Sequence, residues 1–342
     1  MKKLLLILPL LLALVLAACA PPAAPAPAAP AAGGEEAAQP AEEEVFKVGL
    51  LSPGSVNDEG WNSIAYHAML RIQDELGAEM SYVELEQDPA SFEKAFRDYA
   101  SQGYDMILGH GFEFQDAALT VAPEYPDTYF FISSSRVFEN NVIGLNTDSS
   151  QPFYLMGVIA AMMAPEGAGF VGGMEIPPIS EALTGFINGA HSVNPDYPVA
   201  STFIGNFTDA AAAKEAALSM IAQGARFVVP DADVAGLGVF QAVAESGPDV
   251  YTFGAFGDFT DKAPDNILGN YLADYGQGIV NIAKAVKEGT FEPTGNIEFG
   301  LANPDVMWIE FNPNKPLPED VMAAVEAAKQ AIIAGEVNTL AE

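Results

Sequence analysis

The chain of 342 residues has one cysteine and three histidines. A single cysteine cannot form an intramolecular disulfide or a cysteine-rich metal site. The histidines, His67, His110 and His191, do not show the spacing of metal ligands. The sequence also lacks a P-loop, a GxSxG nucleophile motif and an HExxH zinc motif. We therefore expect no metal site, no cofactor and no enzymatic activity.

Basic residues are also scarce. Only 14 lysines and arginines oppose 46 aspartates and glutamates, so the formal net charge is −32. Loss of Lys2 and Lys3 with an N-terminal leader would make it about −34. Such a charge repels nucleic acid and anionic lipid head groups, and it disfavours phosphorylated ligands. We expect no nucleic-acid partner, and we interpret the acidic surface as a source of solubility.

The N-terminus has the pattern of a secretory signal. Lys2 and Lys3 precede an apolar run over residues 4–16, which is too short to span a membrane, and small residues follow. Residues 1–18 therefore predict a lipoprotein signal peptide. The sequence Leu16-Ala17-Ala18-Cys19 resembles the lipobox of bacterial lipoproteins, which implies a lipid on Cys19. The alternative is an ordinary signal peptide that happens to contain a cysteine.

Residues 19–44 consist mainly of alanine, proline and glutamate. This composition cannot bury a core, and proline and like charge keep such a chain extended. We expect a disordered tether that holds a folded body near a membrane surface. The protein would then be extracytoplasmic and lipid-anchored to the cell membrane.

From Val45 onward, short β-like runs alternate with amphipathic helical patterns. This alternation predicts an α/β fold with mostly parallel sheets and right-handed crossovers. The expected strands are Val45–Leu51, Ser81–Leu85, Asp105–Leu108, Thr128–Ile132, Asn141–Leu145, Ala168–Val171, Val199–Ile204, Phe227–Val229, Val250–Phe253, Asn266–Ala273, Asn296–Leu301 and Met307–Phe311.

The length suggests two lobes. Both halves carry a helix that starts near a lysine and ends in Gln-Gly before an apolar strand, around Lys94–Leu108 and Lys214–Val229. We expect lobe 1 to contain residues 45–147 and about 274–292. Lobe 2 would contain residues 148–273 and about 293–342.

One stretch organises the first lobe. An apolar run from Val48 to Leu51 is followed by Pro53 and Gly54. Next come an aspartate, a tryptophan and an asparagine where a helical pattern begins, namely Asp58, Trp61 and Asn62. A strand that leads through a loop to a helix N-terminus forms the ligand crevice of open α/β sheets. A carboxylate, an indole and a carboxamide suit a planar, hydrogen-bonding small molecule. The alternative is that Asp58 only caps the helix and Trp61 only covers the sheet.

The order of several segments resembles the basic membrane protein family, the purine-nucleoside-receptor-like substrate-binding lipoproteins of ABC transporters. The resemblance covers nearly everything from Val45 to Val337. Its segments are Val48–Leu50, Asp58–Asn62, Gly103–Ile107, Gly109–Phe112, Tyr125–Asp127, Phe130–Ile132, Gly172–Gly173, Gly185–Ala190, Gly205–Asp209 and Gly236–Val239.

This resemblance implies a type I periplasmic-binding-protein fold, with two Rossmann-like lobes joined by three crossovers and a ligand cleft between them. In purine-nucleoside-binding relatives, aromatic rings sandwich the base and carboxylates bind the ribose. Trp61 takes the place of the family's usual phenylalanine, and Asn62 that of its asparagine. Phe207 matches an aromatic of the second lobe, and Asp58 the aspartate before the first helix.

The chain departs from the family pattern in one segment. The family often has Gly-Val-Asp-Ser-Asp-Gln, whereas this chain has Gly-Ala-Phe-Gly-Asp-Phe over residues 254–259. Phe256 cannot accept hydrogen bonds from ribose, and Asp258 aligns only with the second aspartate. The departure favours a free base or another flat heterocycle over a nucleoside.

Further candidate ligand-binding residues are His110, Gly111, Phe112, Glu175 and Asp231. Alternatives remain open for several of them. His110 could be a satisfied loop histidine, and Phe112 could pack under the first lobe. Asp231 and its neighbour Asp233 could simply cap the following helix. In the same way, Phe207 could belong to the core.

The resemblance implies a receptor that delivers a purine-like solute to an ABC permease and its ATPase, and we expect it to be a monomer. A first alternative keeps this role but changes the solute to riboflavin or a simple sugar. A second alternative is a surface sensor or adhesion protein that does not transport.

Overall fold

The computed structural model describes residues 45–57, 61–86 and 88–341, without the side chain of Trp61. The expected signal peptide (1–18), the lipidation site Cys19, the tether (19–44) and Asp58 lie outside the described residues. Within this part of the chain, no helix is both long and apolar enough to cross a membrane.

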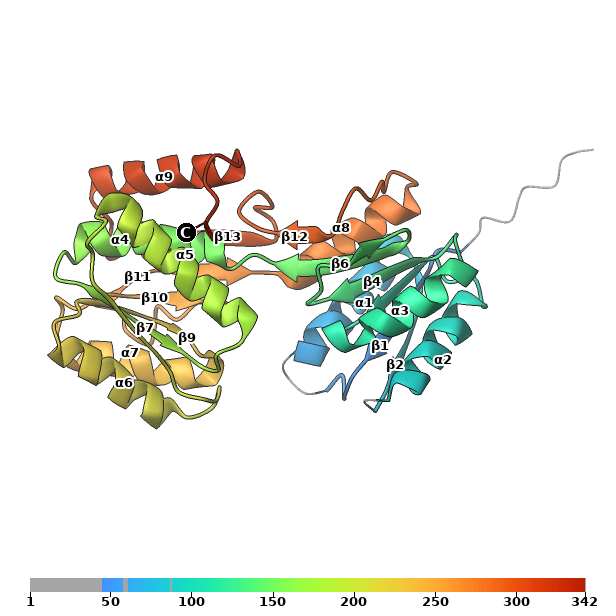
Figure 1. Cartoon of the computed structure of the whole chain (residues 1–342), viewed down its shortest axis with the longest axis horizontal. Coiled ribbons are helices and arrows are strands. Elements are labelled where there is room, and N and C mark those ends of the chain that lie inside the picture. Colours follow the sequence, from blue (N-terminus) through green and yellow to red (C-terminus); the bar gives the residue numbers. More distant parts are fainter. Residues whose placement is uncertain (1–44, 58–60, 87, 342) are drawn as a thin grey trace, which may run out of the picture. The chain divides into compact units, whose positions relative to one another are not determined.

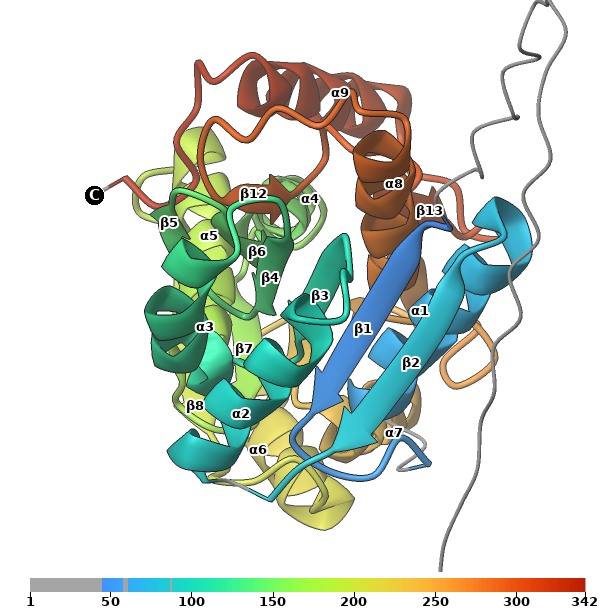
Figure 2. The same ribbon diagram turned by 90° about the vertical axis from the view of Figure 1, so that its right-hand side faces the viewer.

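A first sheet is built mainly from the N-terminal half of the body (Figure 1). Its strands run in the order β12-β6-β4-β3-β1-β2, and every pair along this path is parallel. Figure 2 shows β1 and β2 side by side. β5 pairs with β6 in antiparallel fashion. The strands are β1 (Lys47–Ser52), β2 (Glu79–Glu84), β3 (Met106–Gly109), β4 (Tyr129–Ser133), β5 (Phe138–Glu139), β6 (Val142–Thr147) and β12 (Ile297–Phe299).

Helices cover both faces of this sheet. Val48 and Leu50 of β1 share a buried cluster with α1 (Trp61–Leu76) and α8 (Tyr275–Lys287). Leu51 belongs to another cluster with α2 (Pro89–Ala100) and α3 (Gln115–Val121). Successive side chains of a strand point to opposite faces, so β1 is apolar on both sides. This explains why its sequence is a continuous apolar run.

A second sheet, β8-β7-β9, is wholly parallel, and a third has the order β10-β11-β13 with β13 antiparallel. A parallel bridge between Phe227 and Tyr251 joins β9 to the start of the third sheet. The strands are β7 (Ala168–Gly172), β8 (Val199–Phe203), β9 (Phe227–Asp231), β10 (Thr252–Ala255), β11 (Ile267–Ala273) and β13 (Met307–Phe311). The helices of this part are α4 (Ser150–Met163), α5 (Pro177–Val193), α6 (Ala210–Ala222), α7 (Leu237–Glu245) and α9 (Glu319–Ile333).

The apolar helix α4 belongs to the core. Most of α4 is buried, and it packs against α5 and α9. Glycines permit the close approach of α4 and α5. A Cβ added at Gly189 would lie 1.9 Å from the carbonyl oxygen of Tyr154, and one added at Gly157 would lie 2.1 Å from that of Phe186.

The structure corrects one assignment. Sequence analysis placed everything after residue 293 with the second lobe, but β12 pairs with β6 of the first sheet, Ile297 opposite Leu145. The ring of Phe299 is buried and lies 5.7 Å from that of Tyr275. A strand of three residues is too short to reveal its partner, which is set by these non-local contacts. The chain therefore passes between the first sheet and the later sheets three times, at residues 148–149, 274 and 300–306.

Candidate functional site

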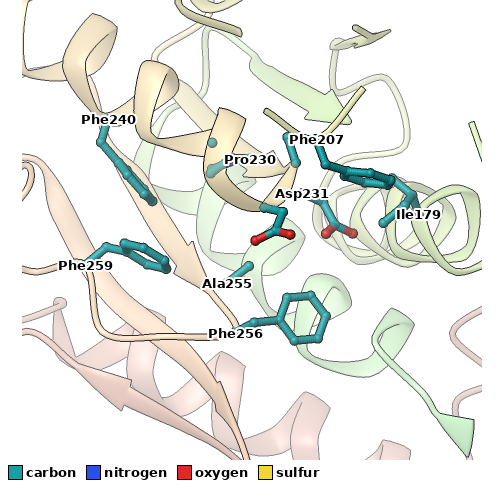
Figure 3. Close-up of a pocket in the computed structure, with 11 residues that line it drawn as sticks. Ile179, Phe207, Pro230, Asp231, Phe240, Ala255, Phe256 and Phe259 are labelled. Carbon is teal, nitrogen blue, oxygen red and sulfur yellow. The ribbon is translucent and has the colours of Figure 1, made fainter. Parts of the chain in front are cut away.

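A pocket of about 330 Å³ lies at the carboxyl ends of β9 and β10 (Figure 3). Ligands of open α/β sheets bind at this end of the strands, and the volume is at the lower end of small-molecule sites. Figure 3 shows aromatic rings arranged around Asp231. The lining residues that matter here are Ile179, Phe207, Asp231, Asp233, Phe240, Phe256 and Phe259.

Strand ends and a short helix position the two acids and Phe256. Asp231 is the last residue of β9, and its carbonyl oxygen accepts a hydrogen bond of 2.9 Å from the amide of Gly173. Asp233 begins the short helix η3 (Asp233–Gly236), and Phe256 follows β10 directly. The rings of Phe240 and Phe259 stack with centroids 5.0 Å apart and form one wall.

Asp231 is the most perturbed acid of the pocket. Its side chain is only 5 % exposed, and its Oδ2 is buried without a hydrogen-bond partner among the described residues. Burial raises the pKa of Asp231 to about 7, and the negative charge of Asp233 adds to this effect. Buried polar atoms are rarely left unsatisfied, so this oxygen points to a missing hydrogen-bond donor.

Two residues of the pocket have a left-handed backbone. Asp233 has φ 51° and Phe256 has φ 64°, a region that few residues other than glycine adopt. Non-glycine residues held in this region cost on the order of 1–3 kcal/mol, and they cluster at functional sites. Their side chains both line the pocket. The strain therefore lies where a ligand would bind.

Phe207 both packs on the core and lines the pocket. Its side chain is partly buried against the main cluster of this part of the chain. A Cβ added at Gly173 would lie 2.3 Å from the Phe207 ring, so only glycine leaves room for it. The carbonyl oxygen of Phe207 accepts a hydrogen bond of 2.9 Å from Ala235 in η3. The core interpretation and the ligand-facing interpretation are therefore compatible.

Asp231 and Asp233 do not cap the following helix. The N-cap residue of η3 is Ala232, and no side chain caps its amide groups. The capping alternative is wrong because Asp231 ends a strand and Asp233 lies inside the helical turn. Asp231 and Phe207 thus lie together in one pocket, as candidates from two different segments of the sequence.

Asp258 lies outside the pocket lining and organises the loop beside it. Its Oδ1 accepts hydrogen bonds from the amide of Thr260 at 2.9 Å and from Nδ2 of Asn270 at 3.0 Å. The bond from the backbone of Thr260 is the main reason why the pKa of Asp258 lies below its usual value. Oδ1 of Asn270 in turn accepts from the amide of Phe259 at 3.0 Å. Asp258 therefore helps to hold the segment that carries Phe256 and Phe259.

The candidates of the first sheet do not line this pocket. His110 follows β3, is fully buried, and has its Nδ1 3.0 Å from Oγ of Ser133. Gly111 has φ 141°, and a Cβ there would lie 2.3 Å from the Glu113 carboxylate. Phe112 is 68 % exposed, so the expectation that it could pack under the first lobe is wrong. It lies on the short helix η1 (Phe112–Phe114), whose buried ring is that of Phe114.

The remaining candidates lie elsewhere. Asn62 is the second residue of α1, near Gly54 in the loop after β1. Glu175 is exposed in the segment after β7 and does not line the pocket. Among the described residues, no group of three or more His, Cys, Asp or Glu side chains could hold a metal ion.

Sequence reasoning missed several lining residues. Ile179 and Phe240 belong to helical apolar stripes and look like ordinary core positions. Phe259 lies in the segment that departs from the family pattern, and Asp233 was considered only as a cap. For Asp233 and Phe259, the one available signal was their place soon after the apolar strands β9 and β10, where parallel sheets collect ligand-binding groups.

Comparison with known proteins assigns the family. Residues 45–341 match the family model of PnrA-like ABC transporter substrate-binding proteins (Bmp). The chain is 28 % identical over 299 residues to a purine-binding protein of Brucella abortus, covering 86 % of this chain and 83 % of that one. It is 27 % identical over 309 residues to the ABC transporter nucleoside-binding protein BmpA of Lactococcus lactis. This match covers 84 % of this chain and 87 % of that one.

Solved structures share the fold. An ABC transporter solute-binding protein of Conexibacter woesei is similar with a TM-score of 0.63 and 27 % identity, covering 86 % of this chain and 98 % of that one. A transcriptional activator of the comK gene from Bacillus halodurans is similar with a TM-score of 0.69 and 24 % identity. This match covers 85 % of this chain and 99 % of that one. The periplasmic-binding-protein-like α/β fold is therefore confirmed. The chain belongs to the Bmp family of PnrA-like substrate-binding proteins of ABC transporters.

Proposed function

We propose that this protein captures a flat heteroaromatic solute, a purine base or a nucleoside, outside the cytoplasm and delivers it to an ABC permease. The observation that carries the proposal is the pocket at the ends of β9 and β10. There, aromatic rings share one concave space with a buried carboxyl group whose Oδ2 has no partner among the described residues. The names of the Brucella and Lactococcus relatives, a purine-binding and a nucleoside-binding protein, support this class of solute.

Stacking would supply much of the affinity. Phe207 and Phe256 present rings to the pocket, and we expect the indole of Trp61 to cover the opposite face of the solute. Base–aromatic stacking contributes about 1–3 kcal/mol per base and tolerates different rings. Hydrogen bonds of the solute with Asp58, Asn62 and Asp231 would then provide selectivity, because a site built for polar groups rejects analogues that lack them.

A free base fits better than a nucleoside. Phe256 occupies the position where the family often has an aspartate that we associate with the sugar, and its ring lines the pocket. A phenyl ring cannot accept hydrogen bonds from ribose hydroxyls. The apolar wall formed by Phe240 and Phe259 offers no such acceptor either.

Closure of two lobes over the solute would exclude water and strengthen these hydrogen bonds. The three passages of the chain between the sheets are the natural hinges, because a few residues at element ends can absorb such a motion. The closed form would be the one that the permease recognises.

We further propose that a lipid on Cys19 fixes the protein to the outer side of the cell membrane, with residues 19–44 as a tether. Replacement of Cys19 by serine should move the protein from the membrane fraction to the soluble fraction. Retention of the variant on the membrane would contradict lipid anchoring at this residue.

A regulatory role without transport is the second candidate. It is favoured by one observation, namely that relatives in two Bacillus species are named transcriptional activators. A permease and an ATPase encoded beside the gene would support transport, whereas a neighbouring histidine kinase would support sensing.

Calorimetric titration with adenine, guanosine, riboflavin and ribose tests the proposal. Binding of a purine with Kd in the micromolar range or below is expected, and free guanine, titrated in the same way, should bind more tightly than guanosine. If only ribose or only riboflavin binds, the solute is that compound and not a purine. Failure of all four ligands to bind would refute the proposed class of solute.

A further inference from the structure

We propose that the pocket selects purines whose edge carries adjacent N–H donors, as guanine does at N1 and at the 2-amino group, with Asp231 as the specificity-determining residue. The inference rests on the proposed function, and it names the part of the solute that the second and third sheets recognise. It concerns hydrogen-bonding chemistry at one edge of the ring and leaves the stacking partners unchanged.

The polar side chains of the pocket are all of one kind. Among the eleven residues that line it, only Asp231 and Asp233 have polar side chains, and both are carboxylic acids. None of the described lining residues is a lysine, arginine, histidine, asparagine, glutamine, serine or threonine. An ionised carboxylate only accepts hydrogen bonds. A solute that binds the ionised form of Asp231 must therefore supply the donors.

Asp231 has the geometry of an acceptor that awaits a donor. Its side chain is almost completely buried at the end of β9, and Oδ2 has no hydrogen-bond partner among the described residues. The backbone bond from Gly173 holds the residue in place. A fork of two parallel N–H groups matches the two oxygens of one carboxylate, and such charge-assisted pairs are the strong ones.

Two acids in one small pocket also repel acceptors. Asp233 faces the same space from η3, and its charge opposes ionisation of Asp231. A donor edge relieves this repulsion, because it stabilises the ionised form of both groups. A carbonyl oxygen turned toward the same carboxylates would instead increase the electrostatic repulsion in the pocket. The pocket should therefore separate guanine from xanthine, which has a carbonyl group at C2 where guanine has an amino group.

The test compares guanine, hypoxanthine and xanthine by calorimetric titration of the purified protein. Guanine should bind at least about tenfold more tightly than xanthine, since one good bidentate pair provides discrimination of this size. Hypoxanthine, which lacks the 2-amino group but has no carbonyl at C2, should lie between them.

Asp231→Asn separates recognition from shape, because asparagine has nearly the same size but can donate a hydrogen bond. The variant should reduce the preference for guanine over xanthine to about threefold or less. Asp233→Asn should reduce it to a smaller extent. Asp249→Asn is the matched control, since Asp249 is exposed and does not line the pocket, and it should keep the full preference.

An unchanged preference in folded Asp231→Asn, or tighter binding of xanthine by the wild-type protein, would overturn the inference and leave the proposed purine receptor intact. Absence of binding by all three purines would instead refute the proposed function, and the inference with it. Circular dichroism of each variant checks that the fold is retained.

Discussion

The ring of Phe256 lies 4.8 Å from the ring of Tyr271, with an angle of 56° between their planes. Tyr271 is completely buried in β11, the strand next to β10, and its Cα is paired with that of Ala255. A buried ring thus supports a half-exposed one whose backbone has the unfavourable φ of 64°. Phe256 is held in position before any solute arrives, which reduces the cost of ordering the site on binding.

Phe256→Ala should weaken purine binding by about 1–3 kcal/mol, the usual contribution of one stacked ring. The free energy of unfolding should change little, because half of this side chain is exposed. Titration calorimetry and urea unfolding measure the two effects. Phe138→Ala is the control, since Phe138 is 44 % exposed in β5 and does not line the pocket. Equal affinities of the two variants would remove Phe256 from the site.

Phe256→Gly distinguishes the effect of losing the ring from the effect of relieving the backbone strain. Glycine adopts a positive φ without penalty, so this variant should lose affinity as Phe256→Ala does but unfold at the same or a higher urea concentration. Lower stability than that of Phe256→Ala would contradict the strain ascribed to this residue.

Trp61→Ala should abolish measurable binding while the fold is retained, because we expect its indole to stack on the solute and not to support the core. The comparison uses calorimetry with the purine that binds most tightly to the wild-type protein, and circular dichroism to follow the fold. Unchanged affinity would exclude Trp61 from the site.

Asp231→Asn should stabilise the protein at neutral pH. In the folded state the carboxyl group keeps its proton up to pH about 7, whereas its ordinary pKa is 3.8. Between these values the folded state binds more protons than the unfolded state, so stability falls as the pH rises. The variant lacks this loss. Its free energy of unfolding relative to that of the wild-type protein should therefore rise from pH 4 to pH 7 and then stay constant, with a total change on the order of 1–4 kcal/mol.

Urea unfolding at pH 4.5, 6 and 8 measures this advantage. A buried amide can add an offset, but that offset does not depend on pH. A difference between wild type and variant that is the same at all three values would show that Asp231 has no raised pKa. Asp249→Asn, which changes an exposed acid, provides the reference for the loss of one negative charge.

Gly189→Ala should destabilise the protein by about 1–3 kcal/mol or more, because the new methyl group would overlap the backbone of α4 at Tyr154. Backbone atoms of a packed helix cannot move aside as the end of a side chain can. Gly295→Ala is the control, since no heavy atom lies within 4 Å of the added Cβ. Similar midpoints of thermal unfolding for the two variants would refute the close approach of α4 and α5.

Glu181→Gln tests an ion pair between distant segments. Arg136, in the loop after β4, donates to both carboxylate oxygens of Glu181 in α5, at 3.0 and 2.8 Å, and to Glu298 at 2.6 Å. Because these groups are partly exposed, the variant should lose less than about 1 kcal/mol of stability. The loss should shrink in 1 M salt. A larger, salt-independent loss would mean that Glu181 acts through packing.

The sequence by itself determined the alternation of strands and helices in the body. Residues such as Val48, Leu50 and Leu51 form a continuous apolar run because both faces of a parallel sheet are covered, and this pattern is local. The family followed from the order of short segments along the chain, which needs no knowledge of their arrangement in space. The roles expected for Trp61 and Cys19 are predictions of the same local kind.

Only the tertiary structure decided which side chains share a pocket. Four different segments supply Phe207, Asp231, Phe240 and Phe256. The sequence around any one of these residues does not predict that the others lie beside it. The raised pKa of Asp231 comes from its burial and from the charge of Asp233, and the burial exists only in the folded chain. The pairing of β12 with the first sheet is likewise non-local. Periodicity shows which face of an element is apolar, but the partner of that face is chosen by packing across the whole chain.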